Sequence, residues 1–182
     1  MRTAVFVFLL LVFACAFGAV AGDGIFDVRK VKWFMTKDEV KRSESTAPVE
    51  ELPGRVVYYA DIFGDKTLLA YQFSDDGKLQ EVVYGFPKKD KTARRAFFEM
   101  MAGELAKKYQ EENTNSQPLA LFRDVLRTYA NERTHVNLSI QEKQGVIMLL
   151  YTEIGTHKAR GEQRRQEDNE RQKKRSEDFR QF

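Results

Sequence analysis

Apolar and polar residues alternate through the middle of the chain in the pattern of β-strands. Three runs, at residues 55–63, 67–73 and 78–86, are rich in the β-branched and aromatic residues that favour strands. The connections between them read "GDK" and "SDDG", and they are short, polar and contain glycine, as hairpin loops do. The pattern therefore predicts an antiparallel meander, one face of which needs a cover.

Helical spacing follows the meander, with apolar residues at every third or fourth position of residues 92–111. This spacing predicts an amphipathic helix that covers the meander. Residues 119–130 show a similar spacing and are also predicted to be helical. Strict alternation at 134–141 and an apolar run at 146–154 then predict two more strands. The expected fold class is α+β, with an antiparallel sheet of about five strands and helices packed on one face.

A shorter helix is predicted at the stretch "WFMTKDEV", ahead of the meander. Thr36 is a favourable N-cap, and Glu39 lies at the spacing of a capping box. Met35 and Val40 occupy the positions of a hydrophobic staple. Serine, proline and glycine in "SESTAP" and "EELPG" end the helix soon afterwards.

The first 21 residues have the three parts of a secretory signal peptide: Arg2, an apolar run and a terminal Ala-Val-Ala. We expect cleavage after Ala21, which leaves an α+β domain over residues 22–155 that is periplasmic or secreted. Two alternatives remain open. Cys15 follows a degenerate lipoprotein box and could carry a lipid, or the segment could stay as an uncleaved anchor, since ~20 apolar residues span a bilayer. All three place the domain outside the cytoplasm, which disfavours ATP- and NAD-dependent chemistry.

The C-terminal residues differ in composition from the rest of the chain. Residues 158–182 contain nine basic and six acidic side chains, so they carry the whole formal net charge of +3. They include hardly any large apolar residue, and this excludes docking through a hydrophobic stripe. We therefore expect residues 156–182 to form a charged extension that is either a solvated helix or disordered. Such an extension could contact an anionic envelope surface or an acidic partner.

Motifs for catalysis, metal binding or cofactor binding are missing from the sequence. His135 and His157 are the two histidines, and neither has a second ligand at a zinc-binding spacing. The single cysteine, Cys15, lies in the apolar N-terminus, so the mature domain has no disulfide framework. We also find no nucleophile elbow and no phosphate-binding loop. The sequence thus predicts a protein that is not an enzyme and uses no cofactor.

Two stretches, "VKWFMTKDEV" and "LLAYQFSDDGKLQEVVYGF", resemble a group of uncharacterised bacterial secreted proteins and lipoproteins. That group begins a helix with W-G-M-[ST]-x-x-[ED]-V and ends a strand with Y-x-F-x-[DN]-G-K-L. The stretches are also similar to the outer-membrane assembly lipoproteins of the BamE type and to β-lactamase-inhibitor-like domains. The resemblance covers about residues 30–110, with weaker support at 134–154, and departs at Phe34, where the group has glycine. It implies an α+β fold and brings no catalytic residue.

The expected function is that of a non-enzymatic periplasmic or cell-envelope protein that acts through protein–protein contacts. Its partner would be an unidentified envelope protein, with no nucleic acid, and with a membrane only if the chain is lipidated or uncleaved. The alternative is a small-ligand or lipid-binding module that uses the sheet face. An extracytoplasmic hydrolase ranks third, because no nucleophile–base pair is visible. The candidate residues of the interaction surface are Trp33, Tyr58, Tyr84, Arg164, Arg165, Lys173, Lys174 and Arg175.

Overall fold

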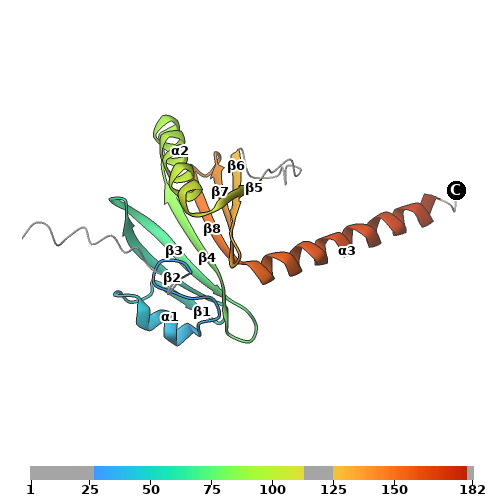
Figure 1. The fold of residues 1–182 in the computed structure, drawn as a ribbon, viewed down its shortest axis with the longest axis horizontal. Coiled ribbons are helices and arrows are strands. Elements are labelled where there is room, and N and C mark those ends of the chain that lie inside the picture. The colour runs from blue at the N-terminus through green and yellow to red at the C-terminus, as the bar shows by residue number, and fades with distance from the viewer. Residues whose placement is uncertain (1–26, 113–124, 180–182) are drawn as a thin grey trace, which may run out of the picture.

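A computed structural model of the chain describes residues 27–112 and 125–179 (Figure 1). The signal segment and Cys15 lie outside these residues. The described part contains three helices and eight strands. In chain order they are α1 (Lys37–Ser43), β1 (Glu50–Leu52), β2 (Arg55–Ile62), β3 (Asp65–Phe73), β4 (Leu79–Pro87), α2 (Lys91–Lys108), β5 (Gln110–Glu112), β6 (Val125–Ala130), β7 (Thr134–Gln141), β8 (Val146–Glu153) and α3 (Ile154–Phe179).

All the strands belong to one antiparallel sheet, so the α+β prediction is confirmed. The sheet has eight strands rather than about five, in the order β1-β2-β3-β4-β8-β7-β6-β5. This order divides the fold into two similar halves, each a helix followed by four strands, and the halves meet where β4 pairs with β8. The two outermost strands, β1 and β5, have only three residues each, too few to show an alternating pattern.

The prediction of a helix at residues 119–130 is wrong for the part that the structure describes. Residues 125–130 form strand β6, which pairs with β7, and residues 119–124 lie outside the described range. Tyr129 is fully buried opposite Val136 of β7. Short apolar segments fit both helical and strand patterns, and here the pairing with β7 decides between them.

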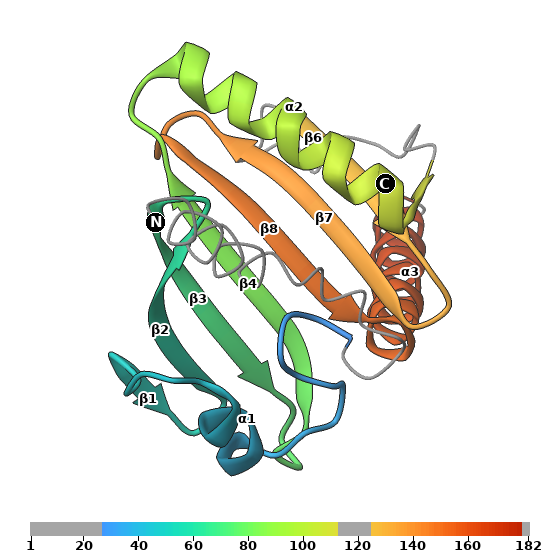
Figure 2. The same ribbon diagram turned by 60° about the vertical axis from the view of Figure 1, so that its left-hand side comes forward.

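One face of the sheet carries the hydrophobic core. Alternate residues of β2, β3 and β4 point into it, and Tyr58, Tyr71 and Phe86 are among the largest fully buried side chains. Helix α2 packs over β5–β8, while α1 and the segment before it lie at the other end of the same face (Figure 2). The meander and the amphipathic helix are therefore confirmed. The prediction that this helix covers the meander is wrong, because α2 packs mainly against β5–β8, the second half of the sheet.

Helix α1 begins as predicted. The hydroxyl of Thr36 accepts a hydrogen bond from the backbone N–H of Glu39 at 3.4 Å, and the Glu39 carboxylate accepts one from the Thr36 N–H at 2.7 Å. Val40 is fully buried, and Met35 packs against the same core. The capping box thus satisfies backbone donors while the staple residues fix the helix to the sheet.

Phe34 has a left-handed backbone, with φ 68°, and its side chain is 51% exposed. A residue with a Cβ atom is strained in this region, whereas glycine is not. We expect Phe34→Gly to be more stable than Phe34→Ala by about 1 kcal/mol, because both lose the ring and only glycine relieves the strain. Urea unfolding of the two variants measures this difference. Equal stability, or a more stable alanine variant, would contradict it.

Candidate functional site

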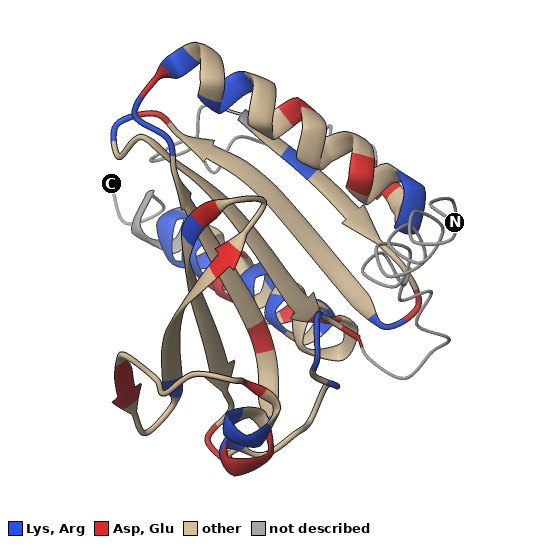
Figure 3. Cartoon of the chain, turned by 90° about the vertical axis from the view of Figure 1, so that its left-hand side faces the viewer, with Lys and Arg blue, Asp and Glu red and all other residues tan. Residues whose placement is uncertain are grey.

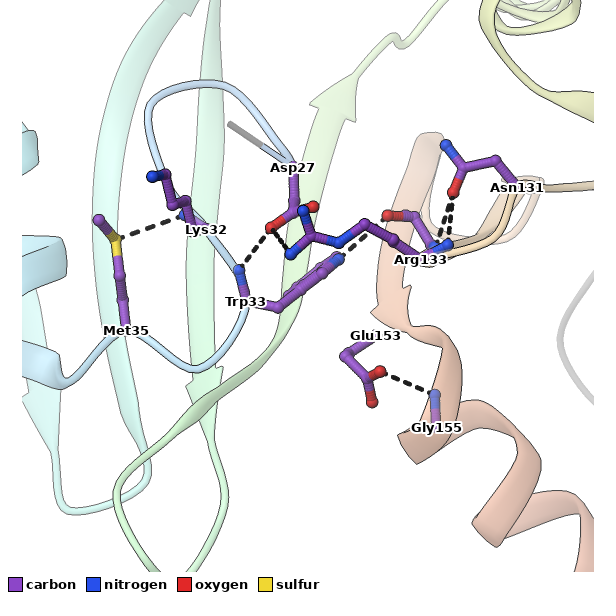
Figure 4. A network of polar contacts seen from close by, with 9 residues as sticks. Asp27, Lys32, Trp33, Met35, Asn131, Arg133, Glu153 and Gly155 are labelled. Carbon is purple, nitrogen blue, oxygen red and sulfur yellow. Dashed lines mark hydrogen bonds and ion pairs between the residues drawn. The ribbon is translucent and has the colours of Figure 1, made fainter. Parts of the chain in front are cut away.

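Trp33 is buried and joins the segment before α1 to the second half of the sheet (Figure 4). Its indole N–H donates a hydrogen bond to the hydroxyl of Thr134, at the start of β7, at 3.0 Å. The Asp27 carboxylate accepts a hydrogen bond from the Trp33 backbone N–H at 2.9 Å and pairs with Arg133 at 3.1 Å. Trp33 therefore holds two parts of the fold together, and its ring is not a free contact surface.

Tyr58 and Tyr84 also point into the covered face. Tyr58 is 1% exposed and packs edge-on against Tyr71, with 5.9 Å between the ring centroids. Tyr84 is nearly as deeply buried and lines a groove beside α2. The three aromatic residues expected at the interaction surface thus lie within the domain rather than on its outside.

The five cationic candidates lie together on α3, which projects away from the domain as a single helix (Figure 1). The helical alternative for the tail holds up to Phe179, and the helix begins at Ile154, directly after β8. The Glu153 carboxylate accepts hydrogen bonds from the backbone N–H groups of Gly155 at 2.9 Å and Thr156 at 2.7 Å. These bonds satisfy two of the free donors at the helix start.

The charges of α3 are mostly directed at solvent. The candidate cations are Arg164, Arg165, Lys173, Lys174 and Arg175, and all are exposed. Among the described side chains, Arg164, Arg171 and Arg175 form no ion pair. Their spacing of seven and four residues places these three arginines on about the same side of the helix. They therefore present guanidinium groups that no described side chain neutralises, and such groups suit carboxylate or phosphate partners.

The base of α3 is attached to the sheet by contacts that the sequence did not reveal. Arg160 forms an ion pair with Glu81 of β4, and Thr152 donates a hydrogen bond to the same carboxylate at 3.4 Å. His157 stacks on His135 of β7, with 3.5 Å between centroids and 13° between ring planes. The histidines are 22 residues apart in the sequence, so only the pairing of β7 with β8 brings them together.

His135 is buried, and its Nε2 lies 3.2 Å from the carboxylate of Glu112 on β5. Burial and the charge of His157 lower the pKa of His135, and the nearby Glu112 only partly opposes them. Burial likewise lowers the pKa of His157, and Arg164 and Arg160 add to this effect while Glu112 opposes it. The folded protein thus favours the neutral form of both rings.

This histidine pair predicts that the protein loses stability in weak acid. An unfolded histidine has a pKa of about 6.5, so below this pH the unfolded chain binds more protons than the folded chain. The contribution of the two histidines to stability is complete above about pH 6.5. It decreases as the pH falls toward their lowered pKa values in the folded protein. His157→Phe keeps a stacked ring without its charge and should reduce the loss between pH 7.5 and 5.5. Unfolding curves at pH 7.5 and pH 5.5 measure the loss of unfolding free energy. An equal loss in His157→Phe and in the unchanged protein would contradict this prediction.

We call the second face of the sheet, which points away from the viewer in Figure 3, the open face. The strand register gives this face an apolar band. The band combines two neighbouring rows of residues that the strand register places side by side. Tyr59 is 48% exposed and Leu68 is 39% exposed, whereas the other members of the band are half-buried or buried. The band consists of Val57, Ala70, Val83 and Leu150 in one row and Tyr59, Leu68, Gly85 and Met148 in the other. Helix α3 leaves the domain beside this band, because its first turns contact β7 and β8.

No protein-family model, no curated protein and no solved structure matches the chain in comparisons with known proteins. The resemblance noted in the sequence therefore stays a prediction. No helix of the described residues has the length and apolar character needed to cross a membrane. Across residues 27–112 and 125–179, no group of three or more histidine, cysteine or acidic side chains is arranged to hold a metal ion.

Proposed function

We propose that this protein is a non-enzymatic protein of the cell envelope that acts through protein–protein contacts. One observation carries the proposal: the apolar band of the open face, which is exposed at Tyr59 and Leu68, borders a projecting helix with arginines that pair with no described side chain. Exposed apolar patches on soluble domains are typical of interaction sites. The partner that fits is a protein whose surface is apolar at the centre and acidic at the margin.

The edges of the sheet support contact through the face rather than through an added strand. Edge strands can pair with another chain, and short, charged edges prevent this. Strand β1 carries Glu50 and Glu51, and strand β5 carries Glu111 and Glu112. Both edges are therefore short and negatively charged, which leaves the open face as the larger surface for a partner.

The arrangement of the histidines supports a binding role over hydrolysis. A general base needs a ring nitrogen directed at its nucleophile. His135 directs Nε2 at Glu112, places Nδ1 beside the amide of Asn137, and has one ring face covered by His157. None of these residues lines the groove beside α2.

Site-specific photocrosslinking tests the proposed contact. We expect a benzophenone side chain at Leu68 or Met148 to capture the same discrete envelope protein, whereas the same group at exposed Val49, outside the band, captures none. Charge reversal in Arg164→Glu/Arg171→Glu should weaken the capture. Capture that is equal at all three positions, or that is insensitive to the charge reversal, would show that the band and α3 do not form one site.

A further inference from the structure

A groove of about 500 Å³ lies on the covered face of the sheet. Its floor is formed by β4 and β8, the strands at which the two halves of the fold meet, through Tyr84, Phe86, Leu149 and Tyr151. Helix α2 forms one wall, and the β2–β3 turn with Arg29 forms the other. This volume is within the range of sites that hold a small molecule.

Three tyrosines, Tyr84, Tyr109 and Tyr151, give the groove hydrogen-bonding capacity that the described part of the protein does not use. Tyr151 packs near both of the others, with ring centroids 5.9 Å from Tyr84 and 6.2 Å from Tyr109. No described residue forms a hydrogen bond with any of the three hydroxyl groups. Burial raises the pKa of Tyr109 to about 12 and raises those of Tyr84 and Tyr151 as well. All three hydroxyls are therefore neutral at physiological pH and can both donate and accept hydrogen bonds.

The charged side chains around the groove balance one another. Arg29 and Lys108 are basic, whereas Asp61 and Glu104 are acidic. The guanidinium of Arg29 is already paired with Glu44, at 3.2 Å. Glu104 is likewise paired with Lys107, so Lys108 and Asp61 remain as one cation and one anion. A charged ligand would lose its hydration and face charges of both signs, which is costly in an apolar site. The balance of charges thus favours a neutral ligand.

Backbone strain is concentrated at the wall of the groove opposite α2. Three described residues other than glycine have a left-handed backbone, and two of them, Arg29 with φ 53° and Phe63 with φ 54°, line this wall. The Phe63 ring is 61% exposed and meets Phe97 of α2 edge-on, with 6.1 Å between centroids. Strain of this kind occurs frequently where a fold positions side chains for a ligand.

We propose that this groove binds a neutral, flat, largely apolar small molecule that carries at least one hydrogen-bonding group. Its rings would lie against Tyr84, Phe86 and Tyr151, and its polar group would meet the free tyrosine hydroxyls. The site lies on the face opposite the open face, so it is separate from the proposed protein contact and can succeed or fail independently.

A matched pair of fluorescent probes tests the ligand class. N-phenyl-1-naphthylamine is neutral and has one N–H donor, and 8-anilinonaphthalene-1-sulfonate has the same rings with an added sulfonate. We expect saturable binding of the neutral probe to the full chain, at least about tenfold tighter than binding of the sulfonate, because an ion in the groove is desolvated without a partner. Tighter binding of the sulfonate, or no saturable binding of the neutral probe, would overturn the proposal.

Variants locate the bound probe. Tyr109→Phe and Tyr151→Phe each remove one hydroxyl and should weaken binding about two- to tenfold, in keeping with the loss of one hydrogen bond. Met101→Trp enlarges a side chain of the groove and should abolish binding. Tyr59→Phe, on the open face, is the matched control and should bind the probe like the unchanged protein.

Two outcomes would assign the probe elsewhere. If Met101→Trp does not fold, as judged by near-ultraviolet circular dichroism, the tyrosine variants decide, and unchanged affinity in both contradicts the proposal. Binding that appears in a chain beginning at residue 27, but not in one beginning at Gly22, would assign the groove to the protein's own N-terminal segment and would also overturn it. Unchanged binding in Arg164→Glu/Arg171→Glu is expected, because those residues belong to the proposed protein contact.

Discussion

Trp33→Ala is expected to lower the free energy of unfolding by about 3–5 kcal/mol, the range observed when a large buried aromatic side chain is removed. The side chain is 5% exposed, and it connects the segment before α1 with the start of β7. Its loss leaves a cavity and also removes the indole N–H that donates a hydrogen bond to the Thr134 hydroxyl. For a domain with a total stability of about 5–15 kcal/mol, this loss is large enough to unfold part of the population.

The neighbouring residue provides the control for Trp33. Phe34 is an aromatic residue of similar size whose ring is 51% exposed, so Phe34→Ala should cost far less. Trp33 is the only tryptophan of the chain, so its variant must be followed by far-ultraviolet circular dichroism rather than by tryptophan fluorescence. Trp33→Phe keeps most of the side-chain volume, so its loss of unfolding free energy should lie between those of Trp33→Ala and Phe34→Ala. A loss for Trp33→Ala no larger than for Phe34→Ala would show that the indole does not anchor the fold.

Elements with long, regular patterns could be predicted from the sequence. The alternation of β2–β4, the helical spacing of α2 and the capping box of α1 all reflect interactions between residues that are near each other in the chain. The three strands that were missed depend on distant partners. Strands β1 and β5 are held by pairing with β2 and β6, and β6 is distinguished from a helix only by its pairing with β7.

The same distinction separates the predicted from the unpredicted parts of the candidate sites. Composition indicated the charged extension, and α3 carries it as a helix. Periodicity could not show which aromatic residues would be core and which would line a groove, because Tyr58 and Tyr84 both alternate inward. The difference arises from α2, which covers β5–β8 and leaves a groove above β4 and β8. Likewise, the histidine stack depends on the β7–β8 register, which no local pattern specifies.

Replacing Arg94 with methionine is expected to cost about 2–3 kcal/mol, because it removes a buried guanidinium that donates hydrogen bonds to a carboxylate and to two backbone carbonyls. Arg94 lies in the first turn of α2, and although it is charged it is only 5% exposed. Its guanidinium donates to the backbone carbonyls of Lys88, at 2.6 Å, and Lys89, at 3.3 Å, and pairs with the Glu142 carboxylate. It thereby connects the start of α2 and the end of β4 to the β7–β8 turn. Methionine keeps the apolar stem and satisfies none of these acceptors.

The adjacent residue offers a matched control for Arg94. Arg95→Met removes the same charge from an exposed position and should change stability by no more than about 0.5 kcal/mol. The Arg94–Glu142 pair should also make stability depend on pH, because the hydrogen bond from Arg94 lowers the pKa of Glu142. This stabilisation is present above the unfolded pKa of about 4.3 and is lost as the pH falls through the lower folded value. The difference between Arg94→Met and the unchanged protein should therefore shrink in urea titrations below about pH 4, whereas a constant difference would mean that Glu142 contributes nothing through Arg94.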